Sequence, residues 1–280
     1  MTRALHALVD GLPVDTISID DRGLQYGHGM FETCRVVNGR IPLWRFHAAR
    51  LSATAVRLHI PLDVAAVDAE ARELAAHCSD AVLKVVVTAG QGQRGYRSDA
   101  VTPRRIVSVF PAPVETVDRG VGATVRLCRM RLAMQPMLAG LKHLNRLEQV
   151  LARAEWSDAG VVEGLMCNVD GRLIEGTMTN LFLVRDGRIV TPDLSRCGVA
   201  GVMRQVLLEQ RPAIDAPIEV RDVAVEELDE AEECFLTNAV IGIWPVSRIV
   251  DRDRTWLRPG RIARSIMSAL EARFGFPRSQ

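Results

Sequence analysis

Residues 162–193 read VEGLMCNVDGRLIEGTMTNLFLVRDGRIVTPD, in which two apolar segments are each interrupted by an Asp-Gly step. Asp-Gly between apolar runs is typical of a tight β-hairpin turn, because both turn residues adopt positive φ there. The turns are therefore expected at Asp170-Gly171 and Asp186-Gly187. Two consecutive hairpins predict a hairpin-rich sheet in this half of the chain.

Strand and helix patterns alternate through the rest of the 280 residues. Alternating or β-branched runs predict strands at 15–21, 81–90, 104–114, 123–130 and 233–246. Residues 31–43 predict a further hairpin that turns at Asn38-Gly39. Apolar residues at helical spacing predict helices at 44–60, 64–77, 144–160, 201–211 and 261–274. The balance indicates an α+β fold in two parts, with the proline-containing segment 111–120 as the linker.

Composition narrows the class of protein. An apolar fraction of 48% with 25% charged residues is typical of a soluble globular chain. The net charge of +1 gives no reason to expect nucleic acid or an anionic membrane as a partner. The six cysteines are scattered, without a C-x-x-C pair or a histidine cluster, so neither a disulfide framework nor a metal site is expected.

Targeting and membrane signals are the next test of location. No apolar stretch approaches the roughly 18 residues of a membrane span, and the N-terminal residues lack the apolar segment of a signal peptide. With the cysteine usage of a reducing compartment, these observations predict a cytoplasmic protein.

Lysine is rare in this chain, and Lys142 stands out. Only Lys84 and Lys142 are lysines among 35 basic residues. Lys142 lies between the apolar segment 134–141 and the expected helix 144–160, where partial burial would lower the pKa of its amine. A neutral amine is a nucleophile that can form a Schiff base, which a guanidinium cannot do. The plainer interpretations are a surface lysine at a helix start and a genomic preference for arginine, and Lys84 is expected to be structural.

A Schiff-base lysine that uses pyridoxal phosphate needs a cation and N–H donors for the phosphate, and a carboxylate for the ring nitrogen. Arg50 follows His47 by three residues on one helix face and offers a guanidinium fork. Gly198 and Gly201 precede an expected helix, whose free N–H groups can bind phosphate. Glu175 ends an expected strand. Each feature alone fits an ordinary structural role, but their combination in one chain favours a cofactor site.

Four stretches resemble the fold-type-IV pyridoxal-phosphate enzymes: DRGLQYGHGMFETCRV (21–36), LKHLNRLEQVLARAEW (141–156), LIEGTMTNLFLVRDGRIVTP (173–192) and GVAGVMRQ (198–205). This family includes the branched-chain and D-amino-acid aminotransferases and the 4-amino-4-deoxychorismate lyases. The resemblance implies a small α/β N-terminal domain (1–115), a larger barrel-like C-terminal α+β domain (120–280) and a homodimer.

The resemblance also implies roles for particular residues. Lys142 corresponds to the Schiff-base lysine and catalytic residue, Glu175 to the partner of the pyridine nitrogen, and Arg50 to the phosphate-binding arginine. Main-chain groups of Val202, Met203, Asn238 and Ala239 would complete the cofactor site, with alanine at 239 where aminotransferase relatives often have threonine. Arg94 on the glycine-rich segment GQGQRGYR, Tyr26 and His28 are the candidate substrate-binding residues.

Within the family, KHLNRLEQV (142–150) and GQGQRGYR (90–97) are most similar to the lyases. The implied reaction converts 4-amino-4-deoxychorismate, a small molecule with two carboxylates, to 4-aminobenzoate and pyruvate for folate biosynthesis. The alternatives are a D-amino-acid or branched-chain aminotransferase on the same scaffold, and a homologue with an inactive site.

Overall fold

The computed structural model describes residues 4–98, 101–114, 117–209, 216–256 and 259–276, and these form two compact units. Unit 1 comprises Met1–Val114 with Leu141–Asn145, and unit 2 comprises Glu115–Gly140 with Arg146–Gln280. The chain passes from one unit to the other within the expected linker 111–120, of which residues 115 and 116 lie outside the described part. Leu141–Asn145 falls within the range 120–280 that was expected for the second domain, yet it groups with unit 1.

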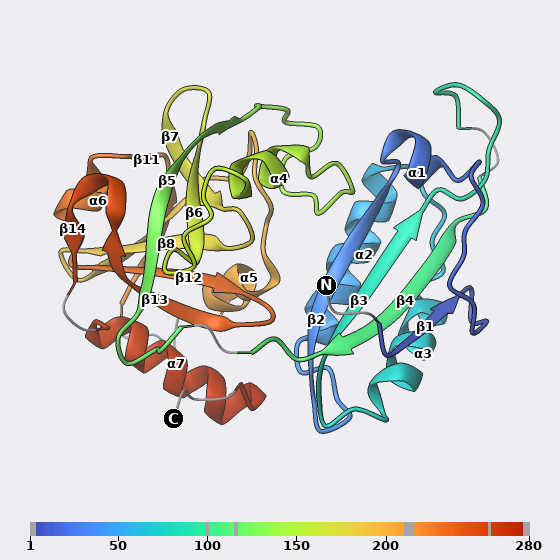
Figure 1. Ribbon diagram of the computed structural model, residues 1–280, viewed down its shortest axis with the longest axis horizontal. Helices are drawn as coiled ribbons and strands as arrows, with labels where there is room; N and C mark the ends of the chain where they lie inside the picture. Colours follow the sequence, from blue (N-terminus) through green and yellow to red (C-terminus); the bar gives the residue numbers. More distant parts are fainter. Residues whose placement is uncertain (1–3, 99–100, 115–116, 210–215, 257–258, 277–280) are drawn as a thin grey trace. The chain divides into compact units, whose positions relative to one another are not determined.

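Unit 1 is a four-stranded antiparallel sheet with helices (Figure 1). The strands follow the order β1-β4-β3-β2. Their bounds are β1 His6–Val9, β2 Gly29–Val37, β3 Asp80–Thr88 and β4 Arg104–Pro111, and the helices are α1 Arg22–Tyr26, α2 Trp44–Arg57 and α3 Val64–Ala75.

The two longer helices cover one face of this sheet. Met30 and Cys34 on β2 are buried in one cluster with Leu51 of α2 and Val67 of α3. Alternate positions such as Phe31 and Thr33 point to the other face and are only half buried. The sheet therefore has one apolar, helix-covered face and one more polar face.

Unit 2 is built on a closed barrel. Its strands follow the order β10-β9-β8-β12-β13-β5-β6-β7-β11, and an additional β7–β8 pairing joins the ends of the inner six strands β8, β12, β13, β5, β6 and β7. The barrel strands are β5 Ala123–Leu132, β6 Glu163–Asn168, β7 Arg172–Gly176, β8 Asn180–Arg185, β12 Glu233–Asn238 and β13 Gly242–Ile249. Apolar side chains including Leu165, Leu181 and Leu236 form a buried core in this unit. The expected barrel is confirmed.

The remaining helices and strands of unit 2 surround the barrel (Figure 1). They are α4 Leu147–Arg153, β9 Arg188–Pro192, α5 Val202–Glu209, β10 Ile218–Arg221, β11 Val223–Ala224, α6 Glu227–Glu230, the 3-10 helix η2 Val250–Arg252, β14 Arg254–Thr255 and α7 Arg261–Phe274. In the described ranges, none of the helices combines the length and apolar content that a membrane crossing requires.

Two of the three predicted hairpin turns have the expected positive φ at both residues, and the turn at Asp170-Gly171 has it only at its glycine. Asn38 and Gly39 have φ of 48° and 74°, and Asp186 and Gly187 have φ of 50° and 69°. Gly171, at the turn between β6 and β7, has φ of 77°. The second arm of the 31–43 hairpin is limited to one residue pair, Val37 with Arg40, because the chain enters α2 soon afterwards.

The strand expected at 15–21 is wrong. These residues form no strand, and the side chain of Ile19 is 79% exposed. Asp21, the last residue of the predicted strand, instead caps α1 by accepting a hydrogen bond from the Gly23 amide at 2.7 Å. An alternating pattern forms a strand only where a neighbouring strand edge is available.

The helix expected at 144–160 is much shorter in the structure. Only Leu147–Arg153 is helical. Leu147, Val150 and Leu151, which were expected to form its buried face, are 74%, 59% and 55% exposed. The apolar stripe of α4 is thus real, but it faces outward in the single chain.

Candidate active site

Lys142 lies beside the first residues of β2 in unit 1. The Phe31 amide donates to the Lys142 carbonyl at 3.0 Å, and the Leu144 amide donates to the Gly29 carbonyl at 3.0 Å. This pairing fixes the backbone on both sides of Lys142 and explains why Leu141–Asn145 groups with unit 1. Lys142 is half-buried, with its Nζ atom 4.5 Å from the centre of the Phe31 ring.

Lys84 approaches the same ring. Its Nζ atom lies 5.6 Å from the ring centre of Phe31. Both lysines of the chain therefore contact one aromatic side chain at cation–π distance. Phe31 was not predicted as a site residue, and its one sequence signal is its place in the GHGMFE stretch.

Arg50 reaches from α2 to a buried carboxylate on β2. Its Nε atom donates to Glu32 Oε1 at 2.7 Å, and its Nη2 atom donates to Glu32 Oε2 at 2.5 Å. His47, one helical turn before Arg50, lies 2.7 Å from Glu32 Oε2 through its Nδ1 atom. Glu32 and His47 are each 1% exposed at the side chain, and Arg50 is 12% exposed.

The charges of this cluster follow from its surroundings. Burial by itself would raise the pKa of the Glu32 carboxyl, but the Arg50 charge and the His47 hydrogen bond outweigh burial and lower this pKa from 4.5 to about 2. Burial lowers the pKa of His47 below its ordinary 6.5, although the hydrogen bond that His47 donates to Glu32 opposes that change. At neutral pH the cluster is therefore an ionised Glu32, a charged Arg50 and a neutral His47 that donates from Nδ1.

Tyr26 and His28, the candidate substrate-binding residues, also make contacts within unit 1. The Tyr26 hydroxyl accepts from the Gly95 amide at 3.0 Å. His28 Nε2 lies 2.9 Å from the Leu58 carbonyl, and His28 Nδ1 accepts from Arg22 Nε at 3.4 Å. Both ring nitrogens of His28 are thus occupied within unit 1, while Arg94 is exposed.

Arg22 was missed by the sequence reasoning and organises the loop that carries Arg94. It is 3% exposed, and its guanidinium donates to the carbonyls of Gly95 at 2.9 Å and Tyr96 at 3.1 Å. The same guanidinium lies 5.0 Å from the Tyr26 ring centre. Nothing in a single sequence distinguishes such an arginine from a solvated one, because its acceptors are carbonyls more than 70 residues away.

Glu175 is buried at the end of β7 in unit 2. Its Oε2 atom accepts from the Val199 amide at 2.8 Å, and its Oε1 atom lies 3.5 Å from Gln149 Nε2 on α4. The side chain is 4% exposed. A carboxylate oriented in this way can accept the N–H of a pyridinium ring.

The polar stretch TMTN that follows Glu175 is held by another buried glutamate. Glu163 accepts from the amides of Thr177 at 3.0 Å and Met178 at 3.1 Å, and from the Thr179 hydroxyl at 3.0 Å. Burial raises the pKa of Glu163, even though these hydrogen bonds favour its ionised form. Glu163 therefore fixes the turn between β7 and β8, and this turn begins two residues after Glu175.

The segment from Gly198 to Gly201 leads directly into α5. A Cβ atom on Gly201 would lie 1.9 Å from Asn180 Oδ1, and Asn180 Nδ2 donates to the Val199 carbonyl at 2.9 Å. Only glycine fits at 201 without displacing Asn180. Val202 and Met203 occupy the first turn of α5, where main-chain N–H groups have no acceptor within the helix.

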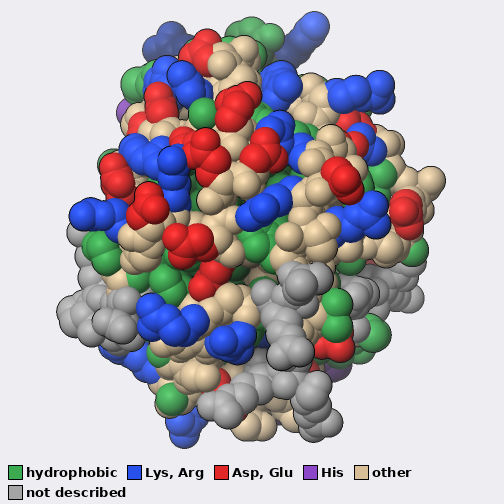
Figure 2. Space-filling model, turned by 90° about the vertical axis from the view of Figure 1, so that its left-hand side faces the viewer, with side chains coloured by type: hydrophobic (Ala, Val, Ile, Leu, Met, Phe, Trp, Pro, Cys, Tyr) green, Lys and Arg blue, Asp and Glu red, His purple; other side chains and the backbone are tan. Residues whose placement is uncertain are grey.

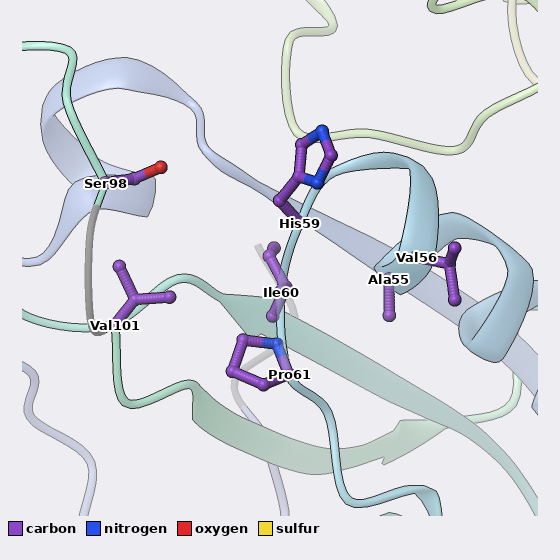
Figure 3. A pocket seen from close by; sticks show the side chains of 7 residues that line it. All are labelled: Ala55, Val56, His59, Ile60, Pro61, Ser98 and Val101. Carbon is purple, nitrogen blue, oxygen red and sulfur yellow. The ribbon is translucent and has the colours of Figure 1, made fainter.

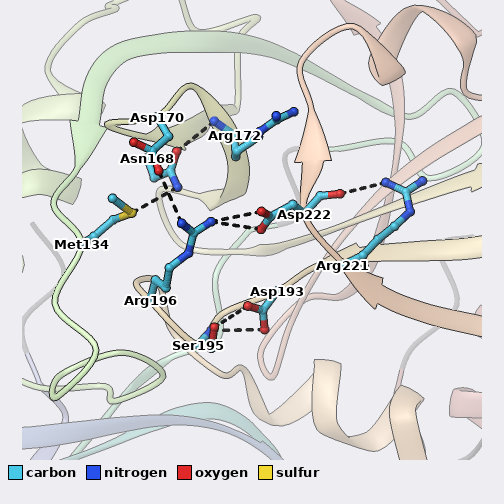
Figure 4. A network of polar contacts seen from close by, with 9 residues as sticks. All are labelled: Met134, Asn168, Asp170, Arg172, Asp193, Ser195, Arg196, Arg221 and Asp222. Carbon is cyan, nitrogen blue, oxygen red and sulfur yellow. Dashed lines mark hydrogen bonds and ion pairs between the residues drawn. The ribbon is translucent and has the colours of Figure 1, made fainter.

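Arg196 ties the chain before α5 to its neighbours (Figure 4). Its guanidinium lies 3.4 Å from Asp170 at the β6–β7 turn and 3.1 Å from Asp222. Its carbonyl accepts from the Gln135 amide at 2.8 Å. These contacts fix the chain just before the segment 198–201, whereas Asn180 fixes the segment itself through Val199.

Asn238 ends β12 and shapes the loop that follows it. Its Oδ1 atom accepts from the amides of Val240 and Ile241, both at 2.9 Å, and its Nδ2 atom donates to the Met178 carbonyl at 3.2 Å. The Asn238 side chain therefore braces the loop, and Ala239 lies in the turn with a half-buried main chain.

The pocket described in unit 1 lies apart from the predicted site residues. An open pocket of about 420 Å³ in unit 1 lies near the end of α2 (Figure 3). Its lining is Ala55, Val56, His59, Ile60, Pro61, Ser98 and Val101, which includes none of the predicted site residues. Among the described residues, no group of three His, Cys, Asp or Glu side chains is placed to hold a metal ion.

The residues of unit 2 fit the phosphate and the ring nitrogen of pyridoxal phosphate. The first turn of α5 follows directly on Gly201, and anions bind helix starts through main-chain N–H groups. Glu175 is a buried carboxylate already oriented by a main-chain donor. In unit 1, Lys142 is a half-buried amine and Arg50 is a guanidinium held by Glu32.

Comparisons with known proteins agree with this chemistry. Residues 29–249 match the family model described as amino-transferase class IV. An aminodeoxychorismate lyase from Vibrio harveyi is 37% identical over 246 residues, which is 86% of this chain and 90% of that protein.

Solved structures extend the comparison. The crystal structure of 4-amino-4-deoxychorismate lyase from Pseudomonas aeruginosa is similar with a TM-score of 0.90 and 49% identity, covering 95% of this chain and 98% of that one. A hypothetical aminotransferase from Mycobacterium tuberculosis, in a PLP-bound form, shares the fold with a TM-score of 0.82 at 18% identity, covering 96% and 98% of the two chains. The chain belongs to the class IV aminotransferase family.

Proposed function

We propose that the protein is a pyridoxal-phosphate-dependent lyase that converts 4-amino-4-deoxychorismate to 4-aminobenzoate and pyruvate, a step that serves folate biosynthesis. The observation that carries the proposal is the 49% identity to a lyase of known structure over 95% of this chain. The aminotransferases fit the family as a whole, and the lyase relatives fit this chain more closely.

Lys142, Arg50 and Glu175 are the residues we assign to the cofactor. Lys142 would bind its aldehyde carbon, Arg50 its phosphate and Glu175 its ring nitrogen. The main-chain N–H groups of Val202 and Met203 would add donors to the phosphate, and the loop at Asn238 and Ala239 would contribute main-chain contacts. The ordered Asn238 side chain supports that loop, because its contacts to Val240 and Ile241 fix the local main chain.

When bound, pyridoxal phosphate supplies an aldehyde that joins to a substrate amine and a ring that accepts electrons from the neighbouring carbon. The amine of Lys142, released when the substrate amine takes its place, would remove the proton from the amine-bearing ring carbon of the substrate. The adjacent C–O bond then breaks, and enolpyruvate leaves and takes up a proton to become pyruvate. The remaining ring becomes aromatic, which drives the reaction forward.

Arg94 is our candidate for a substrate carboxylate. It is exposed on a loop that Arg22 and Tyr26 hold through main-chain contacts at Gly95 and Tyr96. A guanidinium on a fixed loop can bind a carboxylate through two N–H groups. Tyr26 and His28 are our further candidates for substrate contact, and Tyr26 also accepts from the Gly95 amide of this loop.

An assay with two substrates tests the proposal. The protein with pyridoxal phosphate is incubated either with 4-amino-4-deoxychorismate or with D-alanine and 2-oxoglutarate. We expect 4-aminobenzoate fluorescence in the first reaction and little amino transfer in the second. Rapid amino transfer, with D-alanine or a branched-chain amino acid, without 4-aminobenzoate would favour the aminotransferase alternative. Failure of both reactions would favour a homologue with an inactive site.

We propose a homodimer in the cytoplasm, with a small molecule as the substrate and no nucleic acid or membrane partner. The outward stripe of α4, formed by Leu147, Val150 and Leu151, supports association with a second copy, because exposed apolar patches often mark protein interfaces. All six cysteines lie in the described part of the chain and are free, as expected of a reducing compartment. One face of the molecule mixes basic and acidic side chains (Figure 2).

A further inference from the structure

Glu32 is an exception on its strand. The helix-covered face of β2 consists of Met30, Glu32, Cys34 and Val36, of which only Glu32 is charged. A buried ion pair is seldom the most stable choice for such a face, because both charges lose their hydration. The carboxylate therefore calls for a function.

The carboxylate of Glu32 uses both oxygens to fix Arg50. Oε1 accepts from Arg50 Nε at 2.7 Å, while Oε2 accepts from Arg50 Nη2 at 2.5 Å and from His47 Nδ1 at 2.7 Å. This two-point contact sets the plane and the direction of the guanidinium. The His47 contact in turn sets the direction of the carboxylate, and His47 is itself immobilised by burial.

An arginine whose side chain is already held in one conformation binds an anion at a smaller entropic cost. A free arginine side chain must lose much of its rotamer freedom when it binds a phosphate, whereas one that is already held loses little. The carboxylate of Glu32 contacts one edge of the guanidinium, through Nε and Nη2. A charged group that is prepared in this way binds its ligand more tightly than a flexible one.

We propose that Glu32 and His47 are positioning residues that hold the Arg50 guanidinium in the orientation in which it binds the cofactor phosphate. This inference rests on the proposed role of Arg50 in the lyase. It assigns a purpose to a buried charge and a buried histidine, neither of which contacts the cofactor itself.

Binding of pyridoxal phosphate and of pyridoxal, which lacks the phosphate, tests the inference without using catalysis. The dissociation constants are measured on protein freed of cofactor, by the absorbance of the bound aldehyde. We expect Glu32→Gln and His47→Leu to weaken pyridoxal phosphate binding by about tenfold or more and to leave pyridoxal binding unchanged. His47→Asn, whose amide can replace the Nδ1 donor, should restore most of the affinity.

Glu70→Gln is the matched control. Glu70 is also a buried glutamate of unit 1, and it accepts from Arg105 through Nε at 3.0 Å and Nη2 at 2.8 Å. Arg105 is not among the proposed cofactor residues, so this variant should bind both aldehydes as the wild type does. Equal weakening of both aldehydes, or unchanged phosphate preference in Glu32→Gln and His47→Leu, would overturn the positioning role.

The outcomes separate the inference from the proposed function. If the wild type itself prefers pyridoxal phosphate no more than pyridoxal, then Arg50 and α5 do not bind the phosphate and the cofactor assignment fails. If the wild type shows the preference and the variants keep it, only the positioning role fails. Should Glu32→Gln not fold, the pair His47→Leu and His47→Asn still tests the positioning role separately from the cofactor assignment.

Discussion

Phe31 connects the two lysines of this chain. The Nζ atoms of Lys142 and Lys84 lie 4.5 Å and 5.6 Å from the centre of its ring. The scarcity of lysine singles out Lys142, and the family resemblance implies its role. Neither predicts that both lysine amines contact one side chain. The two lysines therefore form a natural pair for testing which amine binds the cofactor.

Lys142→Ala is expected to abolish the covalent link to pyridoxal phosphate. The variant should bind the cofactor weakly, because Arg50 and the α5 N-terminus are unchanged, and it should form no adduct that borohydride can reduce. Mass spectrometry of the treated and digested protein measures the adduct. Lys84→Ala, which removes the other amine at the Phe31 ring, should retain the adduct on the peptide that contains Lys142. An adduct on any other peptide of the wild type would contradict the assignment.

Individual site residues differ in how far a single sequence predicts them. Arg50 and His47 were recognised as one helix face, because residues three apart in a helix are neighbours. Their partner Glu32 lies on a strand 15 and 18 residues earlier, and such a contact depends on how α2 packs against β2. Phe31 and Arg22 were missed for the same reason, since their contacts are made across the fold.

Whole elements were predicted well where hydrophobic period and turn chemistry agreed. The helices α2, α3 and α7 and the Asp-Gly hairpins of unit 2 follow directly from their patterns. The pattern at 15–21 failed, because its one ladder contact is the isolated bridge of Asp21 with Gln91, and α4 was predicted too long. Its apolar residues continue the helical period from Leu144, but the segment before Leu147 pairs with β2 instead.

Acid should weaken the packing of α2 on β2. The unfolded chain takes up a proton at His47 near pH 6.5 and at Glu32 near pH 4.5, whereas the folded state resists both, down to about pH 2 for Glu32. Arg50 and the amine of Lys142 face these groups, and Cys34 adjoins them. The stabilisation is therefore complete at neutral pH and is lost as the pH falls.

Urea unfolding from pH 7 to pH 3 measures this effect in the wild type and in Glu32→Gln. At pH 7 the variant should lose about 3 kcal/mol in free energy of unfolding, because Arg50 loses its buried charged partner. The difference should shrink steadily below about pH 4.5, because the unfolded wild type then takes up a proton at Glu32 while the folded state keeps its charge down to about pH 2. Asp68→Asn, which breaks the exposed pair with Arg72, should cost less than about 1 kcal/mol at any pH. A constant difference for Glu32→Gln across this range would show that Glu32 is not the titrating group.

At the scale of the whole molecule, the barrel of unit 2 brings its predicted residues together. The β7–β8 pairing that closes the barrel sets Glu175 opposite Asn180. Glu175 on β7 accepts from the Val199 amide, and Asn180 on β8 donates to the Val199 carbonyl. Val199, which precedes α5, is therefore held by both β7 and β8. The sequence shows the hairpins and the glycines, but barrel closure depends on strand pairs distant in sequence and entered our expectations only through the resemblance.

The outward face of α4 makes the oligomeric state a test of the whole molecule. The same helix directs Gln149 towards Glu175 and exposes Leu147, Val150 and Leu151. In a homodimer this apolar stripe would be covered, and sedimentation at micromolar concentration should give twice the 30.8 kDa of one chain. Val150→Asp should shift the protein towards the monomer, because an aspartate would lose its hydration at the interface. Val56→Asp is the control, since Val56 is a 73% exposed valine on α2, and it should remain dimeric. A wild type that sediments as a monomer at every concentration would refute the homodimer, and a dimeric Val150→Asp would place the interface elsewhere.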